Sequence, residues 1–318
     1  MTQIYSLADI EAVLPKIDLV KEIASGFAAY SQGLVEVPPV GELLFPGRHG
    51  EMHIKYGAIG GDDVFVIKIA TGFFENPKLG LPPFGGCMLV LSQTTGQVEA
   101  VLLEEGVLTN HRTAAAGAVA AQYLQPASVN RIGIVGTGVQ ARLQALYLKR
   151  VNPCRAVTLW GRTRSAAEAA ARDIAAFGFE VRIAETIEEL CDDCRLIVTT
   201  TPSGTPLLDA GMIRPGTHIT AMGSDTPHKQ EISADVIRMA DLVVVDSIDQ
   251  CQSRGEISRA LKARAITAQE VSELGDIVAN KKPGRRRDTD ITVADLTGVA
   301  VQDIVIAKAV MQQMRLQD

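Results

Sequence analysis

The chain has no excess of positive charge. Its 318 residues contain 31 Lys and Arg against 37 Asp and Glu, which gives a net charge of −6. Such a chain has no global positive field to hold nucleic acid or an anionic membrane. No apolar run approaches the roughly 20 residues of a membrane span, and the first residues carry acids where a secretory signal needs a basic start. We therefore expect a cytoplasmic protein with no nucleic-acid or membrane partner, whose function lies in a local site.

Cysteines are few, and their number is odd. Five are scattered over the chain, which is typical of reduced thiols rather than of a disulfide framework. Cys191 and Cys194 form the one pair with redox or metal-binding spacing. Because no second pair exists and no histidine lies near it in sequence, we interpret this pair as structural and predict no metal site.

The sequence has enough apolar residues for a large core. Hydrophobic residues make up 47% of the chain, which excludes a disordered protein, and at roughly 150 residues per domain the length predicts about two domains. A basic run at residues 281–287 surrounds a Pro-Gly pair and contains no aromatic residue that could stack on a base. We interpret it as a solvated loop.

From Arg131 onward, short aliphatic runs alternate with alanine-rich, charged stretches that have helical periodicity. This alternation predicts an α/β domain of the Rossmann type, with a doubly wound parallel sheet covered on both faces. The predicted helices are 140–151 and 164–177. The predicted strands are 131–135, 156–160, 180–183, 196–200, 218–222 and 242–245.

The part before Arg131 has a different pattern. It predicts an amphipathic helix at 19–30, strands at 51–56, 63–70 and 88–91, and a helix of small side chains at 113–124, which together indicate an α+β lobe. After Ile291 the sequence predicts a strand, a Thr-Gly turn and a long helix, and we expect this helix to complete the amino-terminal lobe. The predicted domains are residues 1–125 with 296–318, for substrate binding and dimerisation, and residues 126–295, for dinucleotide binding.

A glycine-rich turn follows the first strand of the predicted sheet. Gly136, Thr137, Gly138, Val139 and Gln140 form the G-x-G-x-x-A pattern with Ala141, between a strand and a helix. The glycines allow a tight turn and close approach of a pyrophosphate, whose charge the helix N-terminus stabilises. The sequence therefore predicts a dinucleotide site at these five residues.

The residues after the second strand decide which dinucleotide is favoured. An Asp or Glu here would bind the ribose hydroxyls of NAD. This chain instead has Arg162 and Thr163, followed by Arg164. Guanidinium groups suit a 2′-phosphate, which favours NADP over NAD. The alternative is that Arg162 stacks on the adenine and the cofactor is NAD.

Three charged residues could serve a hydride-transfer site. Lys68 lies in the apolar run VFVIKIA, where a lysine must meet an anion, either an acid inside the protein or the carboxylate of a ligand, which we favour. Arg112 is a second cation in LTNHRTAAAG. Asp225 follows a strand at the edge where open α/β sheets bind ligands, and it could handle a proton. A helix-capping role is the alternative for Asp225.

The sequence resembles the ornithine cyclodeaminase and mu-crystallin superfamily over nearly its whole length. The five shared motifs are K-x-A-x-G-F at 68–73, L-T-x-x-R-T-A-A at 108–115, G-x-G-x-Q at 136–140, G-x-D-x-P-x-K-x-E at 223–231 and G-x-A-x-Q-D at 298–303. The resemblance implies a homodimer with a Rossmann domain and a substrate lobe. It also implies that Lys68 and Arg112 hold the substrate carboxylate and that Asp225 is the catalytic acid or base. The predicted cofactor contacts are completed by Arg112, Thr201, Ser224, Lys229 and Gly298.

One departure from the family pattern bears on the substrate. Ornithine cyclodeaminases carry a glutamate thirteen residues before the lysine of the first motif, where it receives the distal ammonium of the substrate; this chain has Lys55 there. A lysine repels an ammonium and suits a distal carboxylate. His228, where relatives usually have glycine, is a further candidate for a substrate contact, with a structural role as its alternative.

We therefore predict an NAD(P)H-dependent reductase of a small α-imino acid, from the imine reductase or amino-acid dehydrogenase branch of the superfamily. The preferred substrate is an imino dicarboxylate such as iminosuccinate, which gives aspartate. Two alternatives are a cyclic ketimine (pyrroline-2-carboxylate) reductase and an ornithine cyclodeaminase that recycles bound NAD. A ligand-binding role without turnover, as in a crystallin, is a further alternative from another class.

Overall fold

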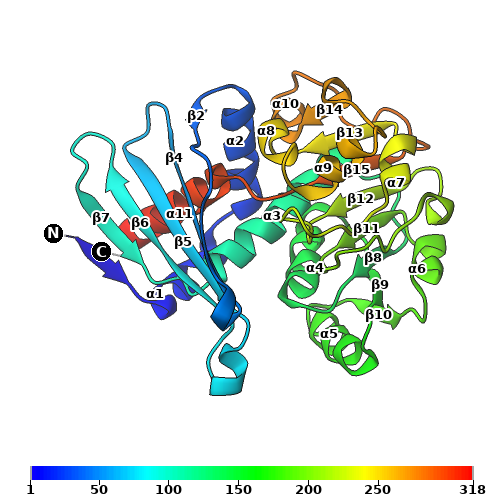
Figure 1. The fold of residues 1–318 in the computed structure, drawn as a ribbon, viewed down its shortest axis with the longest axis horizontal. Coiled ribbons are helices and arrows are strands. Elements are labelled where there is room, and N and C mark those ends of the chain that lie inside the picture. The colour runs from blue at the N-terminus through cyan, green and yellow to red at the C-terminus, as the bar shows by residue number, and fades with distance from the viewer. Residues whose placement is uncertain (1, 317–318) are drawn as a thin grey trace. The chain divides into compact units, whose positions relative to one another are not determined.

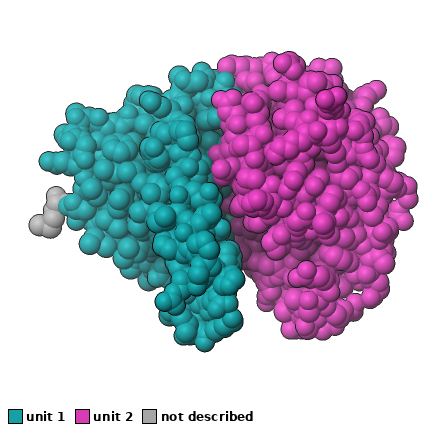
Figure 2. All heavy atoms as spheres, viewed as in Figure 1, with its two compact units in different colours: residues 1–112, 299–318 teal, residues 113–298 magenta. Residues whose placement is uncertain are grey.

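The computed structural model describes residues 2–316, and the chain divides into two compact units (Figure 2). Unit 1 comprises Met1–Arg112 and Val299–Asp318, and unit 2 comprises Thr113–Gly298. Helix α3 (Val107–Leu124) contains the division between Arg112 and Thr113, and the carboxyl-terminal segment belongs to unit 1. The functional domains with boundaries at 125 and 296 stay a prediction.

Unit 1 is built on a seven-stranded sheet with the order β1-β7-β6-β5-β4-β2, in which β3 also pairs with β4. Its pairs are antiparallel except for the parallel pair of β1 and β7. The strands are β1 (Gln3–Tyr5), β2 (Val35–Glu36), β3 (Gly41–Phe45), β4 (Gly50–Ile59), β5 (Val64–Phe73), β6 (Phe84–Ser92) and β7 (Val98–Leu102). The helices are α1 (Leu7–Val13), α2 (Leu19–Ser31) and α11 (Ala300–Arg315), with short turns η1 (Leu14–Lys16), η2 (Pro46–Arg48) and η3 (Asn76–Leu79).

Helix α11 lies across one face of this sheet and packs against α2 (Figure 1). The approach is close where small residues permit it. A Cβ atom added at Gly26 of α2 would lie 3.0 Å from Val305 of α11, and one at Gly57 of β4 would lie 3.4 Å from Ile304. The face of the sheet that bears Gly57 therefore faces α11, and the predicted docking of the last helix on the amino-terminal lobe is confirmed.

Unit 2 is built on a wholly parallel sheet of eight strands with the order β10-β9-β8-β11-β12-β15-β13-β14. The strands are β8 (Ile132–Val135), β9 (Ala156–Trp160), β10 (Glu180–Ile183), β11 (Leu196–Thr199), β12 (His218–Ala221), β13 (Leu242–Val245), β14 (Val271–Glu273) and β15 (Thr292–Asp295). The helices after α3 are α4 (Val139–Val151), α5 (Arg164–Ala176), α6 (Ile187–Asp193), α7 (Ala234–Met239), α8 (Ile248–Cys251), α9 (Gly255–Lys262) and α10 (Leu274–Val278), with turns η4 (Ala210–Met212) and η5 (Ala268–Glu270).

The six predicted strands of the Rossmann-type sheet are confirmed, and two more strands join them. The strand expected after Ile291 is β15, which inserts between β12 and β13. Strand β14 was not predicted, because three residues of mixed polarity carry too little periodicity to indicate a strand. The carboxyl ends of β11, β12, β15 and β13 consequently lie side by side along one edge.

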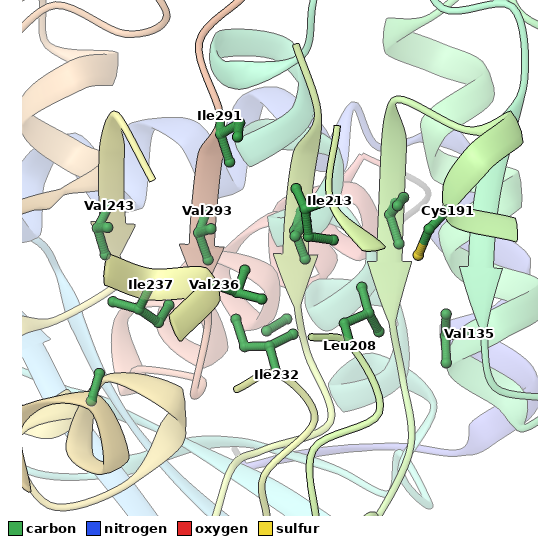
Figure 3. Close-up of a cluster of buried hydrophobic side chains, with 14 of the residues drawn as sticks. Val135, Cys191, Leu208, Ile213, Ile232, Val236, Ile237, Val243, Ile291 and Val293 are labelled. Atoms are coloured by element: carbon green, nitrogen blue, oxygen red, sulfur yellow. The ribbon is translucent and has the colours of Figure 1, made fainter. Parts of the chain in front are cut away.

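Aliphatic side chains from the sheet and its helices form the core of unit 2 (Figure 3). Val243 and Val293 from neighbouring strands are buried there with Ile237 of α7. Cys191 and Cys194 belong to the same cluster, and burial raises the pKa of each thiol to about 12. Both thiols therefore fill core space in a protonated, unreactive form.

The basic run 281–287 is a largely exposed loop, as predicted, and two of its arginines have partners within the chain. Arg285 is half-buried and donates to the carbonyl oxygens of Leu124, at 2.7 Å, and Asp290. Arg287 pairs with Asp290 at 2.7 Å and with Asp241 at 3.0 Å. These arginines hold their own loop together. Across residues 2–316, no helix combines the length and the apolar character that crossing a membrane requires.

Candidate functional site

Unit 1 contains a buried cluster of charged side chains under helix α11. Lys68, in the middle of β5, is 2% exposed, and its Nζ lies 2.9 Å from Oδ1 of Asp303. Arg112 of α3 donates from Nε to the same oxygen at 3.1 Å and from Nη1 to Oε1 of Gln302 at 2.9 Å. The structure therefore supplies an internal acid as the partner of Lys68, because α11 brings Asp303 to β5. This is the alternative that we did not favour from the sequence. It also places Lys68 and Arg112 against one carboxylate, as neighbours.

The charged groups of this cluster shift one another's pKa values. Burial raises the pKa of Asp303, but Lys68, Arg112 and Lys55 outweigh that effect and hold the pKa below its ordinary value. Burial and the charge of Arg112 lower the pKa of Lys68. The other nearby acid is Glu104, whose pKa burial raises. Two cations thus share one firmly ionised acid.

Lys55 adds a third cation to the same face of the sheet. It is the direct cross-strand neighbour of Lys68 in the pairing of β4 with β5. Side chains that are paired in this way project from the same face, and like charges at such positions destabilise a sheet. Three positive side chains therefore surround Asp303, which is a suitable environment for an anionic ligand.

The glycine turn of unit 2 lies between β8 and α4, as predicted. Gly136 has φ of +128°, a conformation that L side chains rarely adopt. A Cβ atom here would lie 2.4 Å from Oγ1 of Thr200, whereas one at Gly138 would meet no atom within 4 Å. In the described part of the chain, no side chain caps the first turn of α4. Its N–H groups and Gly138 thus offer open backbone to a pyrophosphate, and the residues fit a dinucleotide.

The other predicted residues of the glycine turn, Thr137, Val139 and Gln140, differ in their contacts. Val139 is largely exposed, and Gln140 follows it in the first turn of α4. Thr137 accepts a hydrogen bond from Arg142 through its carbonyl oxygen. The side chain of Thr137 faces Gly161, where a Cβ atom would lie 2.3 Å from Cγ2 of Thr137. A residue larger than glycine would therefore disturb the strand end that leads to Arg162.

The two arginines after β9 have different environments. Arg164 pairs with Glu168 at 3.1 Å and with Glu185 at 2.6 Å. Arg162 is exposed, and Thr163 is the N-cap residue of α5 but makes no capping hydrogen bond through its side chain. Arg164 is thus paired with two exposed acids of its own chain, and Arg162 and Thr163 remain the residues predicted to contact a 2′-phosphate.

Asp225 lies in the loop after β12. Its side chain is 52% exposed, and Oδ1 lies 2.6 Å from Nζ of Lys229. Ser224 is buried and donates to the carbonyl oxygen of Lys229 at 2.9 Å, which closes the loop. His228 is exposed at the tip of this loop. The structure therefore brings Asp225, Ser224 and Lys229 together and leaves His228 at the surface.

Two predicted cofactor residues are held by buried acids that sequence reasoning missed. Thr201 donates from its backbone N–H and from its hydroxyl group to Glu231, at 2.5 and 2.8 Å. Gly298 donates to Asp246 at 2.6 Å. Glu231 and Asp303 each end one of the family motifs, and this position in a motif was the available signal. Gln302 was missed as well, although it is the fixed glutamine of the same motif as Asp303.

The sequence as a whole matches one known family. The sequence model of the Ornithine cyclodeaminase/mu-crystallin family matches residues 1–317. The chain belongs to this family. A family relative from Sinorhizobium fredii, an uncharacterized cyclodeaminase, is 40% identical over 315 residues, which cover 98% of this chain and 95% of that protein. The iminosuccinate reductase of Paracoccus denitrificans is 33% identical over 267 residues, which cover 83% of this chain and 82% of that enzyme.

A solved structure of the same family has the same fold. It is an archaeal alanine dehydrogenase dimer with bound NAD, with a TM-score of 0.91, 30% identity, and coverage of 99% of this chain and 97% of that one. The predicted membership of the ornithine cyclodeaminase/mu-crystallin family and the predicted Rossmann-type fold are therefore confirmed.

Proposed function

We propose that this chain reduces a small α-imino acid to the amino acid, and that its preferred substrate carries a second carboxylate, as iminosuccinate does. The chain is an NAD(P)-dependent oxidoreductase that acts on C–N and C=N bonds. The substrate is the part that we propose. The observation that carries this proposal is the pairing of Lys55 with Lys68 beside Arg112, around a single firmly ionised acid.

The proposed binding of the substrate follows from the charges in unit 1. Lys68 and Arg112 would hold the α-carboxylate, as the family motifs imply; the two cations are neighbours, since both lie within 3.1 Å of one oxygen of Asp303. Lys55, on the same face, would attract the distal carboxylate. A diamino acid such as ornithine would instead bring its ammonium toward Lys55. The charge of this position thus favours a dicarboxylate over the substrate of a cyclodeaminase.

Unit 2 would hold the dinucleotide through residues 136–140, with Thr201, Ser224, Lys229 and Gly298 as further contacts. When bound, the reduced nicotinamide supplies a hydride to the imine carbon. Asp225 would handle the proton at the substrate nitrogen, and its Oδ1 lies 2.6 Å from Nζ of Lys229. Arg162 is the basis for proposing NADP, with NAD as the alternative, since the NAD-bound alanine dehydrogenase is a relative.

We also propose a homodimer. The face of the unit 1 sheet opposite α11 carries apolar side chains that are only half-buried, among them Ile54, Ile67 and Ile69. A second copy of this chain could cover that face, and the related archaeal alanine dehydrogenase is a dimer. Light scattering on the wild-type protein and on an Ile69→Asp variant tests this. We expect twice the chain mass for the wild type and a monomer for the variant.

A spectrophotometric screen tests the proposed activity. Oxidation of NADH and NADPH is followed with oxaloacetate and ammonia, with monocarboxylic 2-oxo acids and ammonia, and with preformed cyclic imines. We expect the largest kcat/KM for oxaloacetate with ammonia. In parallel, the enzyme is incubated with ornithine and NAD, and proline and ammonia are assayed. Efficient formation of proline would overturn the argument from Lys55, and a cyclic imine as the best substrate would support the reductase but not the dicarboxylate.

A further inference from the structure

Glu231 is a buried carboxylate with four hydrogen-bond donors around it. Its residue has no exposed surface. Oε1 accepts from the N–H and the hydroxyl of Thr201, at 2.5 and 2.8 Å, and Oε2 accepts from the hydroxyl of Thr199 and the N–H of Gly223, both at 2.7 Å. Every acceptor position of the carboxylate is therefore used.

These four donors lie at the carboxyl ends of two neighbouring strands and in the loops that follow them. Thr199 ends β11, and Thr201 follows it; Gly223 follows β12. Glu231 itself ends the loop that begins at Gly223 and carries Asp225. One side chain thus closes the base of the Asp225 loop and attaches that base to the neighbouring loop. The fit is tight, since a Cβ atom on Gly223 would lie 2.1 Å from the carbonyl oxygen of Thr201 and 2.7 Å from Cδ of Glu231.

Burial keeps the pKa of Glu231 above its ordinary value, although the donors of Thr201, Thr199 and Gly223 around the carboxylate favour its ionised form. A proton on Oε1 or Oε2 could be donated only to the hydroxyl oxygen of Thr201 or of Thr199, because a backbone N–H cannot accept a hydrogen bond. The protonated form would therefore cost the hydrogen bond that this hydroxyl group donates to Glu231.

A second acid fixes the backbone of Glu231. Oε1 of Glu256, in α9, accepts from the N–H of Glu231 at 2.7 Å, and Oε2 accepts from the N–H of Ile232 at 3.3 Å. The carbonyl oxygen of Glu231 accepts from Leu207 and Leu208. Both the side chain and the backbone of Glu231 are therefore held in place from several elements of unit 2.

We propose that Glu231 is a positioning residue that ties the ends of β11 and β12 together and so determines where Thr201 and Asp225 lie. This inference rests on the proposed function, in which Thr201 contacts the cofactor and Asp225 handles the proton. Glu231 touches neither reacting group. It acts by fixing the two loops before a ligand binds, which removes the cost of ordering them afterwards.

Glu231→Gln tests the proposal with almost no change of shape. In either orientation the amide group of glutamine faces one backbone N–H, of Thr201 or of Gly223, and leaves it unpaired. Glu273→Gln is the matched control, because Glu273 is the last residue of β14 in unit 2 and also accepts a backbone N–H, that of Ile248 at 3.1 Å. Thr199→Val removes a single donor to Glu231, and Thr199→Ser keeps the hydroxyl group.

The first readout needs no substrate. In hydrogen exchange of the ligand-free protein, we expect the N–H of Thr201 or of Gly223 to exchange at least tenfold faster in Glu231→Gln and unchanged in Glu273→Gln. We also expect the affinity for NADH, measured by the fluorescence of Trp160, to fall at least fivefold. These measurements remain valid if no imino acid is turned over, so a failure of the proposed function is distinguishable from a failure of this inference.

The second readout separates positioning from stability. With the best imino acid of the screen, we expect kcat of Glu231→Gln to fall at least tenfold while KM for the imino acid changes less than threefold, because unit 1 is unaltered. Thr199→Val should lose part of kcat, and Thr199→Ser should restore it. The proposal is overturned if the N–H groups of Thr201 and Gly223 in Glu231→Gln exchange as slowly as in the wild type. It is also overturned if one of them exchanges faster but the affinity for NADH and kcat are unchanged. If Glu231→Gln does not fold, the Thr199 pair decides by the same criteria.

Discussion

Replacement of Asp303 by asparagine tests the buried cluster of unit 1 most directly. Asp303 is 1% exposed and accepts from Lys68 and Arg112 on one oxygen, so Asp303→Asn leaves two neighbouring cations in the interior without their carboxylate. Removal of one partner from a buried ion pair costs about 3–5 kcal/mol. We expect unit 1 of this variant to lose that amount of unfolding free energy at pH 7.

The same unit offers a matched control. Asp62 pairs with Lys308, and both side chains are partly exposed, at 22% and 34%. Because solvent screens this pair, Asp62→Asn should cost only about 0.2–1 kcal/mol. Urea unfolding followed by circular dichroism, with calorimetry to separate the transitions of the two units, measures both variants.

The pH dependence gives a second criterion for Asp303→Asn. Burial and Arg112 already lower the pKa of Lys68 from its ordinary value of 10.5, and loss of the carboxylate lowers it further. Between the folded and unfolded pKa values, the unfolded chain binds more protons, so the variant should gain stability as the pH rises toward 10.5. If Asp303→Asn costs no more than Asp62→Asn, the reasoning about the buried cluster is refuted.

Three further predictions concern other parts of the chain. Arg162→Ala should raise the Kd for NADPH at least tenfold and leave the Kd for NADH within twofold. Arg164→Ala is the control, because Arg164 is paired with Glu168 and Glu185. Equal losses of affinity for both dinucleotides would exclude phosphate recognition by Arg162. Lys55→Glu should lower kcat/KM for the imino dicarboxylate at least 100-fold and that for a monocarboxylic imine much less, and an equal decrease for both would remove Lys55 from substrate selection. Burial raises the pKa of Glu256 to about 8 from an ordinary 4.5, so unit 2 should lose stability as the pH rises from 4.5 to about 8, at about 1.4 kcal/mol per unit of pKa difference. Urea unfolding of Glu256→Gln should show a smaller slope in this range, and an unchanged slope would contradict the assignment.

The direction of that pH effect depends on the groups around Glu256. The folded state retains a proton that the unfolded chain has released above pH 4.5, so unfolding releases protons and stability falls with rising pH. Glu231, Asp295 and Asp246 are the acids nearby, and burial also raises the pKa of Asp295. Asp295 and Glu231, whose pKa values burial raises, should therefore account for the slope that remains in Glu256→Gln.

The sequence predicted most of the fold because periodicity and glycine patterns act locally. The strands of the Rossmann-type sheet were found to within a residue or two, and the glycine turn at 136–140 was placed between its strand and helix. The structure departs from prediction where tertiary contacts decide. β14 is a strand only because β13 pairs with it, and α3 extends back to Val107 through an otherwise ambiguous stretch.

The candidate site shows a sharper division between what a sequence can and cannot reveal. A lysine in an apolar strand needs an anionic partner, and this requirement identified Lys68 as a candidate. The partner itself could not be identified, because Asp303 lies 235 residues further along the chain. Glu231 was equally hidden, because its value comes from four donors on two loops that only the parallel sheet brings together. The cations and glycines of the site could be predicted because each departs from the apolar pattern of its own segment. The acids that position them could not, because their role depends on contacts between distant segments. Buried acceptors of this kind are consequently where a structure adds most to the chemistry of a family already recognised by its motifs.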